Sequence, residues 1–190
     1  TEDQDEDRVA ALIAQAKAAP VGRLQFGMIK MFMDGVFDTW TAHLVGGYPD
    51  DPAQDGPRLI SAPAFAQLCT SADAAGLQSA VHAVGDGAVR AVLDGYAAAQ
   101  AANGKRDSRH RIEHIDTIHD DDLPRLKALG VMASMQPVHP PGSAGLPLEP
   151  TISIMGRARW PNAFAWARIA GQGTPLAFGT DCPVSPLDPL

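Results

Sequence analysis

The sequence contains few cysteines: Cys69 and Cys182 are the only two among 190 residues. Two cysteines are too few for the disulfide framework of a small secreted domain, and these two lack the C-x-x-C spacing of redox and zinc motifs. We therefore expect reduced thiols and a cytoplasmic protein.

The chain also lacks excess positive charge and long apolar runs. Its formal net charge is −7 and its pI is about 5.2, a balance that argues against binding to a phosphate backbone. No run approaches the roughly 18 to 20 apolar residues that span a bilayer. These absences predict a small-molecule substrate, with neither nucleic acid nor membrane as a partner.

Several enzyme signatures are missing as well. Gly85-Asp86-Gly87 lacks the third glycine of a dinucleotide fingerprint, and no Gly-Lys-Ser/Thr phosphate loop occurs. A Gly-x-Ser-x-Gly nucleophile elbow is also absent. Nucleotide-binding and serine-hydrolase functions are therefore disfavoured.

What the chain does contain is a regular alternation of helical and apolar segments. With 45% hydrophobic and 19% charged residues, it has the composition of a globular domain with a core. Helix followed by strand, five times over, predicts an α/β fold of parallel strands, either a doubly wound sheet or part of a β/α barrel. The expected helices are 3–19, 62–75, 86–102, 120–129 and 162–170, and the expected strands are 25–33, 77–84, 108–115, 131–136 and 175–179.

Two segments break this alternation. Residues 36–61 are rich in Gly, Pro and Asp, and residues 138–161 are rich in Pro and Gly, which predicts long loops. Loops of this length in a compact domain are usually functional or mobile. We expect both to lie over the active-site face.

Polar side chains follow the ends of all five expected strands. They are Lys30, His82, His114, Gln136 with the nearby His139, and Asp181. A barrel brings groups from several strands together at its C-terminal face, whereas an open sheet concentrates them at one crevice. The distribution favours the barrel.

Each of these residues also has an ordinary interpretation. Lys30 fits a solvent-seeking lysine beside Asp34, a Schiff-base lysine or a modified one, and spacing does not decide among them. His82 alone fits a hydrogen-bonded structural residue, and Asp181 fits a helix cap or turn. Together, two imidazoles, a carboxylate and a lysine predict a site for zinc, iron or manganese that activates water.

Strict alternation along the third expected strand assigns its side chains to two faces. His110, Ile112 and His114 would share one face, while Arg111 and Glu113 would share the opposite, outer face. This assignment makes His110 the nearest further histidine to the expected site.

The strand-end motifs resemble the amidohydrolase superfamily, specifically amidohydrolase family 3, which includes N-substituted formamide deformylase-like enzymes. The resemblance covers nearly the whole chain. It implies a (β/α)8 TIM-type barrel with an added β-sandwich, and metal-dependent hydrolysis of carbon–nitrogen bonds. The motifs that carry it are Ile29 to Gly35, Val81 to Asp86, Arg111 to His114, Ala133 to Pro137 with His139, and Gly179 to Val184.

The resemblance also assigns roles to individual residues. Lys30 matches a fourth-strand lysine that related enzymes carry as a metal-bridging carbamate, and His82 and His114 match metal ligands of the fifth and sixth strands. Asp181 matches an eighth-strand aspartate that binds metal and shuttles a proton. One or two divalent ions, with zinc preferred, are implied as cofactor. Gln136 and His139 are candidates for substrate contact.

One departure from the family pattern has consequences for the whole chain. The family's first strand supplies a His-x-His pair, which is absent from this sequence. We therefore expect residues 1–190 to be the C-terminal portion of a barrel, lacking the first strands and the sandwich, with an incomplete metal site. Its open edges predict self-association. A non-catalytic regulatory or binding protein on a degenerate scaffold stays open as the alternative.

Overall fold

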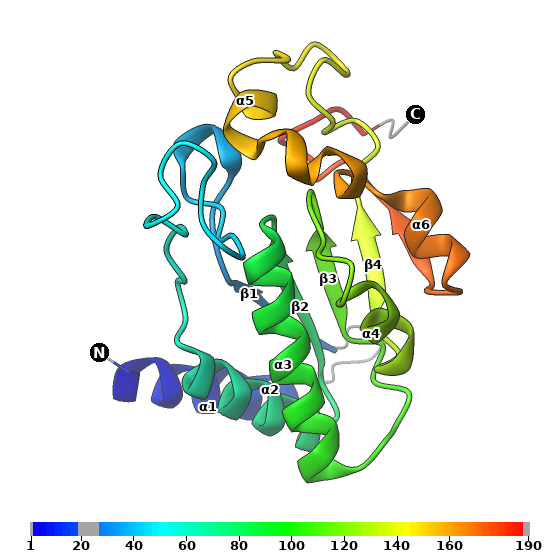
Figure 1. The fold of residues 1–190 in the computed structure, drawn as a ribbon. Helices are drawn as coiled ribbons and strands as arrows, with labels where there is room; N and C mark the ends of the chain where they lie inside the picture. Colours follow the sequence, from blue (N-terminus) through cyan, green and yellow to red (C-terminus); the bar gives the residue numbers. More distant parts are fainter. Residues whose placement is uncertain (1, 19–26, 188–190) are drawn as a thin grey trace.

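The computed structural model describes residues 2–18 and 27–187, and the strands in these ranges form one parallel sheet (Figure 1). Their spatial order is β1-β2-β3-β4-β5, the same as their order in the chain. A doubly wound sheet reverses its strand order at a switch point, whereas a β/α barrel does not. The fold is therefore an arc of a TIM-type barrel, as the sequence predicts. The strands are Met28–Phe32, Gln78–Ala83, Arg111–His114, Met132–Met135 and Leu176–Phe178.

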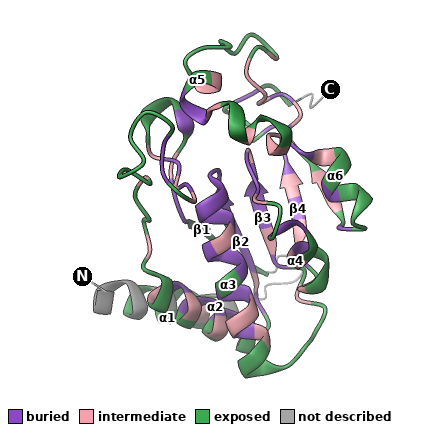
Figure 2. Ribbon diagram, viewed as in Figure 1, coloured by how far each residue is buried: buried purple, intermediate pink, exposed green. Residues whose placement is uncertain are grey.

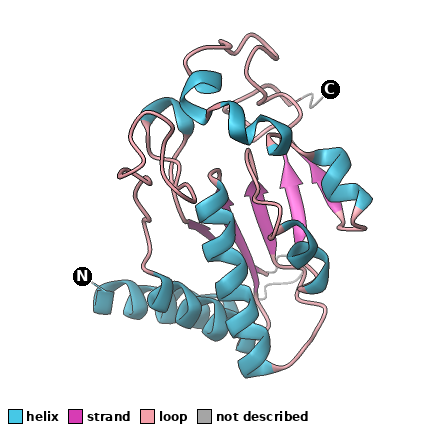
Figure 3. Ribbon diagram, in the orientation of Figure 1, coloured by secondary structure: helices cyan, strands magenta, loops and turns pink. Residues whose placement is uncertain are grey.

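Helices connect the strands and match the five expected positions (Figure 3). The segments expected to be irregular also contain short helical turns, η1 (Phe37–Thr39), α5 (Thr151–Met155) and η2 (Arg157–Asn162). The expected end of the first helix at Pro20, and residues 25 and 26 of the first expected strand, lie outside the described residues. The five main helices are α1 (Glu2–Ala18), α2 (Ala62–Ala74), α3 (Asp86–Asn103), α4 (Leu123–Ala128) and α6 (Trp166–Gly171).

The main hydrophobic core lies between one face of the sheet and the helices. Val81 and Ile112 of the strands pack into it with Val89 and Leu93 of α3, and all four are fully buried. Figure 2 shows this buried layer in the strands and along much of α3. Gly95 lets α3 approach α2 closely, since a Cβ there would lie 2.4 Å from the Phe65 ring. Helical packing therefore covers this side of the sheet.

The opposite face of the sheet carries the polar residues. The strand register aligns Phe32 with His82, and His82 with Glu113. Arg111, two residues before Glu113, therefore shares this face, and Lys30, two residues before Phe32, does too. The prediction that Arg111 and Glu113 lie on the outer face is wrong, because it relied on alternation continuing through His114.

The two long loops pack on each other at the C-terminal ends of the strands, above the arrowheads in Figure 1. Phe37, Leu44 and Tyr48 of residues 36–61 form a second buried cluster with Ile154 and Met155 of the other loop. Within residues 2–18 and 27–187, no helix is both long and apolar enough to cross a membrane.

Candidate functional site

Three histidines meet at the C-terminal end of the sheet. The ring centroids of His82 and His114 lie 4.5 Å apart in an edge-to-face arrangement. The His139 ring stacks on His114 at 5.8 Å with an interplanar angle of 9°. The structure thus brings together residues that the sequence predicts separately at the ends of three successive strand segments.

A local reversal of the backbone places His114 in this group. His114 has a φ of +79° and Ile115 a φ of +55°, left-handed values that non-glycine residues adopt rarely. Ile115 packs into the main core with Ile112, whereas the His114 ring contacts His82. Because both residues have left-handed backbone, each side chain lies on the face of the sheet opposite to the one that strict alternation predicts.

Burial and mutual charge keep the histidines neutral. Burial, together with the neighbouring His82, Lys30 and His139, lowers the pKa of His114 to about 3. Burial also lowers the pKa values of His82 and His139. Neutral imidazole is the form that ligates metals, so these rings are in the protonation state that metal binding requires.

The backbone fixes the tautomer of His82. Its Nε2 lies 2.9 Å from the carbonyl oxygen of Gly35, which can only accept a hydrogen bond. Nε2 therefore carries the proton, and Nδ1 keeps the lone pair that a metal ion would use. Such an outer hydrogen bond is the usual way in which proteins orient a ligating histidine.

Lys30 lies on the same face of the sheet, among charged groups. Its pKa is lowered by partial burial, while the carboxylates of Glu113 and Asp181 raise it and Arg111 lowers it. The Nζ atom lies 5.0 Å from the centroid of the Phe32 ring. Lys30 is exposed, as the interpretation of a solvent-seeking lysine expects, but it does not pair with Asp34, because that carboxylate accepts hydrogen bonds from backbone amides.

Asp181 follows β5 in a turn closed by the Val184 amide, which donates to the Asp181 carbonyl at 2.8 Å. Its φ is +57° and the residue is exposed. The negative charge of its carboxylate partly opposes the lowering of the pKa values of Lys30, His82 and His139 by burial. Asp181 therefore lies on the side of the site that the histidines occupy.

Two polar atoms near the histidines have no hydrogen-bond partner. They are Oε1 of Gln136 and Nε2 of His139, and both are buried. Buried polar atoms without partners are rare and often mark a ligand position. Among residues 2–18 and 27–187, however, no three His, Cys, Asp or Glu side chains are close enough together to hold a metal ion. The described residues thus fit a metal in part, offering two or three imidazoles but no complete ligand set.

Asp34 is a buried organiser that sequence reasoning missed. Its carboxylate accepts hydrogen bonds from the backbone amides of His43, Val84 and Gly85 at 2.9 to 3.0 Å. Burial raises the pKa of Asp34 to about 6, although these amides oppose the shift. Its position after an apolar strand indicated only a turn.

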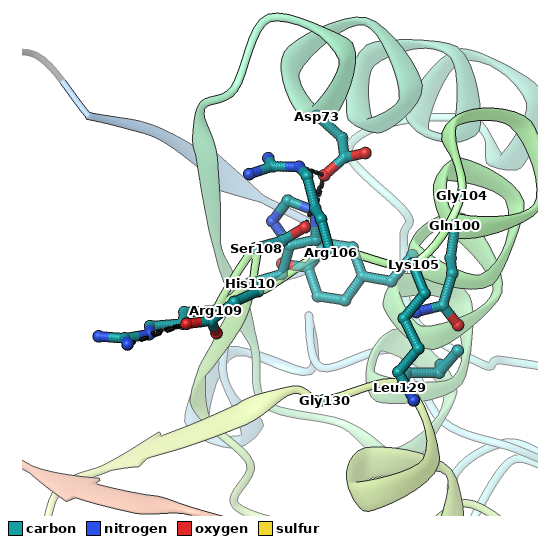
Figure 4. Close-up of a pocket in the computed structure, with 12 residues that line it drawn as sticks. Asp73, Gln100, Gly104, Lys105, Arg106, Ser108, Arg109, His110, Leu129 and Gly130 are labelled. Carbon is teal, nitrogen blue, oxygen red and sulfur yellow. Dashed lines mark hydrogen bonds and ion pairs between the residues drawn. The ribbon is translucent and has the colours of Figure 1, made fainter.

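His110, the nearest further histidine by sequence, does not join the site. It lies at the N-terminal end of the sheet, beside a cavity of about 440 Å³ (Figure 4). Two of the basic side chains around this cavity are already paired, Arg106 with Asp73 and Arg109 with Asp107. This cavity therefore stands apart from the histidine group.

A second cavity of about 440 Å³ lies at the C-terminal end, between the two long loops. Tyr48 and Pro49 line it from the first loop, and Arg157 and Arg159 line it from the second. Asp86, at the start of α3, also lines this cavity. The loops therefore border an open cavity beside the start of α3, and none of the three clustered histidines lines it.

Comparison with known proteins gives concordant matches. The sequence profile described as "Amidohydrolase family" matches residues 3–190. The Bacillus subtilis protein YtcJ, named as an amidohydrolase, is 30% identical over 88% of this chain, and Arabidopsis thaliana LONG AFTER FAR-RED 3 is 32% identical over 88%. This chain spans 30% and 28% of their lengths, respectively. The crystal structure of an uncharacterized metal-dependent hydrolase from Pyrococcus furiosus is 29% identical over 94% of this chain and 36% of its own, with a TM-score of 0.74.

Proposed function

Because this chain belongs to the amidohydrolase family, we propose that it is the C-terminal barrel portion of a metal-dependent hydrolase that cleaves carbon–nitrogen bonds in small molecules. The observation that carries this proposal is the pairing of two neutral imidazoles, His82 and His114, at the C-terminal ends of adjacent parallel strands. Catalytic groups of β/α barrels lie at this end of the strands. The similarity to the Pyrococcus furiosus protein, described as a metal-dependent hydrolase, supports metal dependence.

His82 and His114 would hold a divalent metal, for which zinc is the expected ion. A metal in such a site lowers the pKa of bound water and so supplies hydroxide near neutral pH. Nδ1 of His82 is the available donor, since Nε2 donates to Gly35. The remaining ligands would come from Asp181, Lys30 and parts of the relatives that this chain does not cover.

The other residues of the site have separate roles in this proposal. Asp181 would accept a proton from the attacking water at its carboxylate and return it to the leaving nitrogen. Gln136 and His139 would bind the substrate, since each has a buried polar atom without a partner. Carbamate formation on Lys30 requires an uncharged amine, and the lowered pKa of Lys30 favours that form.

Zinc binding by the 190-residue chain tests the ligand assignment. We expect calorimetric titration to show an affinity for zinc that falls at least about tenfold in His82→Ala and in His114→Ala, the scale on which ligand-sphere changes act. His119→Ala is the matched control, because His119 lies on the surface and pairs with Asp121. Unchanged affinity in both site variants would exclude these ligands.

Hydrolysis itself is tested on the full-length protein that contains this chain, with a panel of N-formyl and simple amide substrates. We expect metal-dependent release of amine that Asp181→Asn abolishes. Turnover unaffected by this substitution would remove Asp181 from the mechanism.

A non-catalytic role on the same scaffold is the second candidate. The observation in its favour is that no three potential ligands converge among the described residues. A full-length protein that binds no zinc and hydrolyses none of the panel would support this alternative.

A further inference from the structure

The segment His43–Val45 of the first long loop is bonded to the turn that follows His82. The His43 carbonyl accepts hydrogen bonds from the amides of Gly87 and Ala88, at 3.0 and 3.2 Å. These amides belong to the first turn of α3 and would otherwise lack partners. The loop thus caps the helix through its backbone.

Asp86 makes the second connection between these segments. Its Oδ1 accepts a hydrogen bond from the Val45 amide at 2.9 Å, and its Oδ2 lies 3.3 Å from Nε of Arg159. The side chains of Asp86 and Arg159 are 8% and 14% exposed. A mostly buried ion pair therefore joins the start of α3 to the second long loop.

Arg159 also binds the first long loop directly. Its Nη2 donates to the carbonyl oxygens of Val45 at 2.8 Å and Gly47 at 2.9 Å. Gly46 and Gly47 have φ values of +75° and +76°, and a Cβ at Gly47 would collide with the Pro52 carbonyl. Glycine is therefore required in the conformation that presents these carbonyls to the guanidinium.

We propose that Arg159 is a positioning residue that fastens residues 151–160 to residues 42–48 through Asp86 and the Val45 and Gly47 carbonyls, so that the two long loops move as one unit over the turn that follows His82. The planar guanidinium is suited to this task, because it presents several donors in a fixed fork. A lysine carries one ammonium on a flexible stem and cannot reproduce that fork. This inference is independent of the proposed hydrolysis.

The coupling has a consequence for how the loops can move. Both loops lie at the C-terminal end of the sheet and share the buried cluster around Tyr48 and Met155. Because Arg159 joins them, displacement of one loop would carry the other with it.

Hydrogen exchange of backbone amides in the full-length protein that contains this chain tests this proposal. In Arg159→Met we expect exchange at least about tenfold faster at the amides of Val45, Tyr48, Gly87 and Ala88, as well as within 151–160. Exchange in β3 and β4 should stay unchanged, because local opening leaves the core strands intact. In Arg159→Lys we expect the same pattern, since charge without the fork does not hold the carbonyls.

Arg168→Met is the matched control, because Arg168 forms a surface pair with Asp120 in the same part of the chain. Faster exchange confined to residues 151–160, or full protection in Arg159→Lys, would overturn the proposal. Uniform acceleration that includes β3 and β4 would also overturn it, since that pattern reports general destabilisation. If Arg159→Met fails to fold, Asp86→Asn provides the same test, because it keeps an acceptor for Val45 while removing the charge pair.

Discussion

The two ends of the sheet each hold a buried histidine from the third strand segment, and their surroundings differ. At the N-terminal end, Nδ1 of His110 accepts from the Ser79 amide at 3.0 Å and Nε2 lies 3.1 Å from Asp73. At the C-terminal end, His114 lies between His82 and His139, in left-handed backbone. His110 and His114, four positions apart in the chain, thus lie in different environments.

The difference teaches how to separate a structural histidine from a candidate ligand. His110 has both ring nitrogens committed to the protein, and its ring stacks on Tyr96 at 4.8 Å. At the other end, Nε2 of His139 is buried without a partner. An uncommitted nitrogen, rather than burial, is the feature that distinguishes the candidate site from the structural network.

The largest effect is expected for Asp73→Ala, which tests whether the network around His110 is structural. Asp73 accepts hydrogen bonds from Arg106, Ser108, His110 and Asn103, of which only His110 is buried. We expect the free energy of unfolding to fall by about 3–4 kcal/mol, since four hydrogen bonds of about 1 kcal/mol each are lost. Urea denaturation measures it, with the exposed Asp107→Ala as a control that should change little. A loss below about 1 kcal/mol would show that the N-terminal network is not structural.

The same carboxylate gives the N-terminal end a defined pH dependence. Burial alone would raise the pKa of Asp73, but hydrogen bonds from Ser108 and Asn103, together with Arg106, hold the pKa below its usual value. A folded-state pKa below the unfolded one contributes stability above about pH 4 that is lost as pH falls through the folded value. The difference in Tm between the protein and Asp73→Asn should therefore be largest near pH 7 and shrink below pH 4. A difference that stays constant with pH would contradict this account.

Gly85→Ala probes the opposite end. The φ of Gly85 is −77°, which alanine adopts freely, but the added Cβ would lie 2.0 Å from the His43 carbonyl oxygen. We expect a loss of about 1–3 kcal/mol, typical of overpacking, and displacement of residues 42–45. Gly171→Ala is the control, since nothing lies within 4 Å of its Cβ position. Stability equal to that of the control would mean that this loop is not anchored on the turn.

The smallest effect is expected for Gln136→Leu. Oε1 of Gln136 is buried without a partner and its Nε2 donates only a long hydrogen bond of 3.4 Å to the Ser134 carbonyl, so an apolar replacement should change stability by less than about 1 kcal/mol. At the N-terminal end, Tyr96→Phe removes a hydroxyl that donates to the Ser79 and Arg111 carbonyls, and should cost about 1 kcal/mol. Thermal unfolding of both variants measures these changes in stability. A larger loss of stability in Gln136→Leu than in Tyr96→Phe would contradict the contrast between the two ends of the sheet.

The positions of helices and strands follow from local signals, which is why the sequence predicts them well. Gly76, with a φ of +80°, follows the end of α2, and Pro124 lies in the first turn of α4. Such stops, together with apolar runs, are properties of neighbouring residues. The sequential strand order also confirms the barrel, which the spread of polar strand ends favours over a doubly wound sheet.

The detailed geometry of the site depends on contacts that no local pattern encodes. Arg159 and Asp86 are 73 residues apart in the chain, and Asp34 binds the amides of Val84 and Gly85, which are 50 and 51 residues away. The face predicted for Arg111 and Glu113 is wrong because the local sequence does not encode the irregular backbone at His114 and Ile115. Alternation is a property of regular strands, and a β-branched residue such as Ile115 gives no signal of left-handed backbone. The roles of the strand-end residues in catalysis stay predictions.

The left-handed pair at His114 and Ile115 shows that the candidate site depends on backbone conformation as much as on side-chain identity. If this sheet were rebuilt with regular strands, the imidazole of residue 114 would turn toward the helices and Ile115 would face the other histidines. Idealised backbones are the usual starting point for protein design. A designed copy would therefore keep every amino acid of this site and still lose it, unless the two irregular φ angles were copied as well.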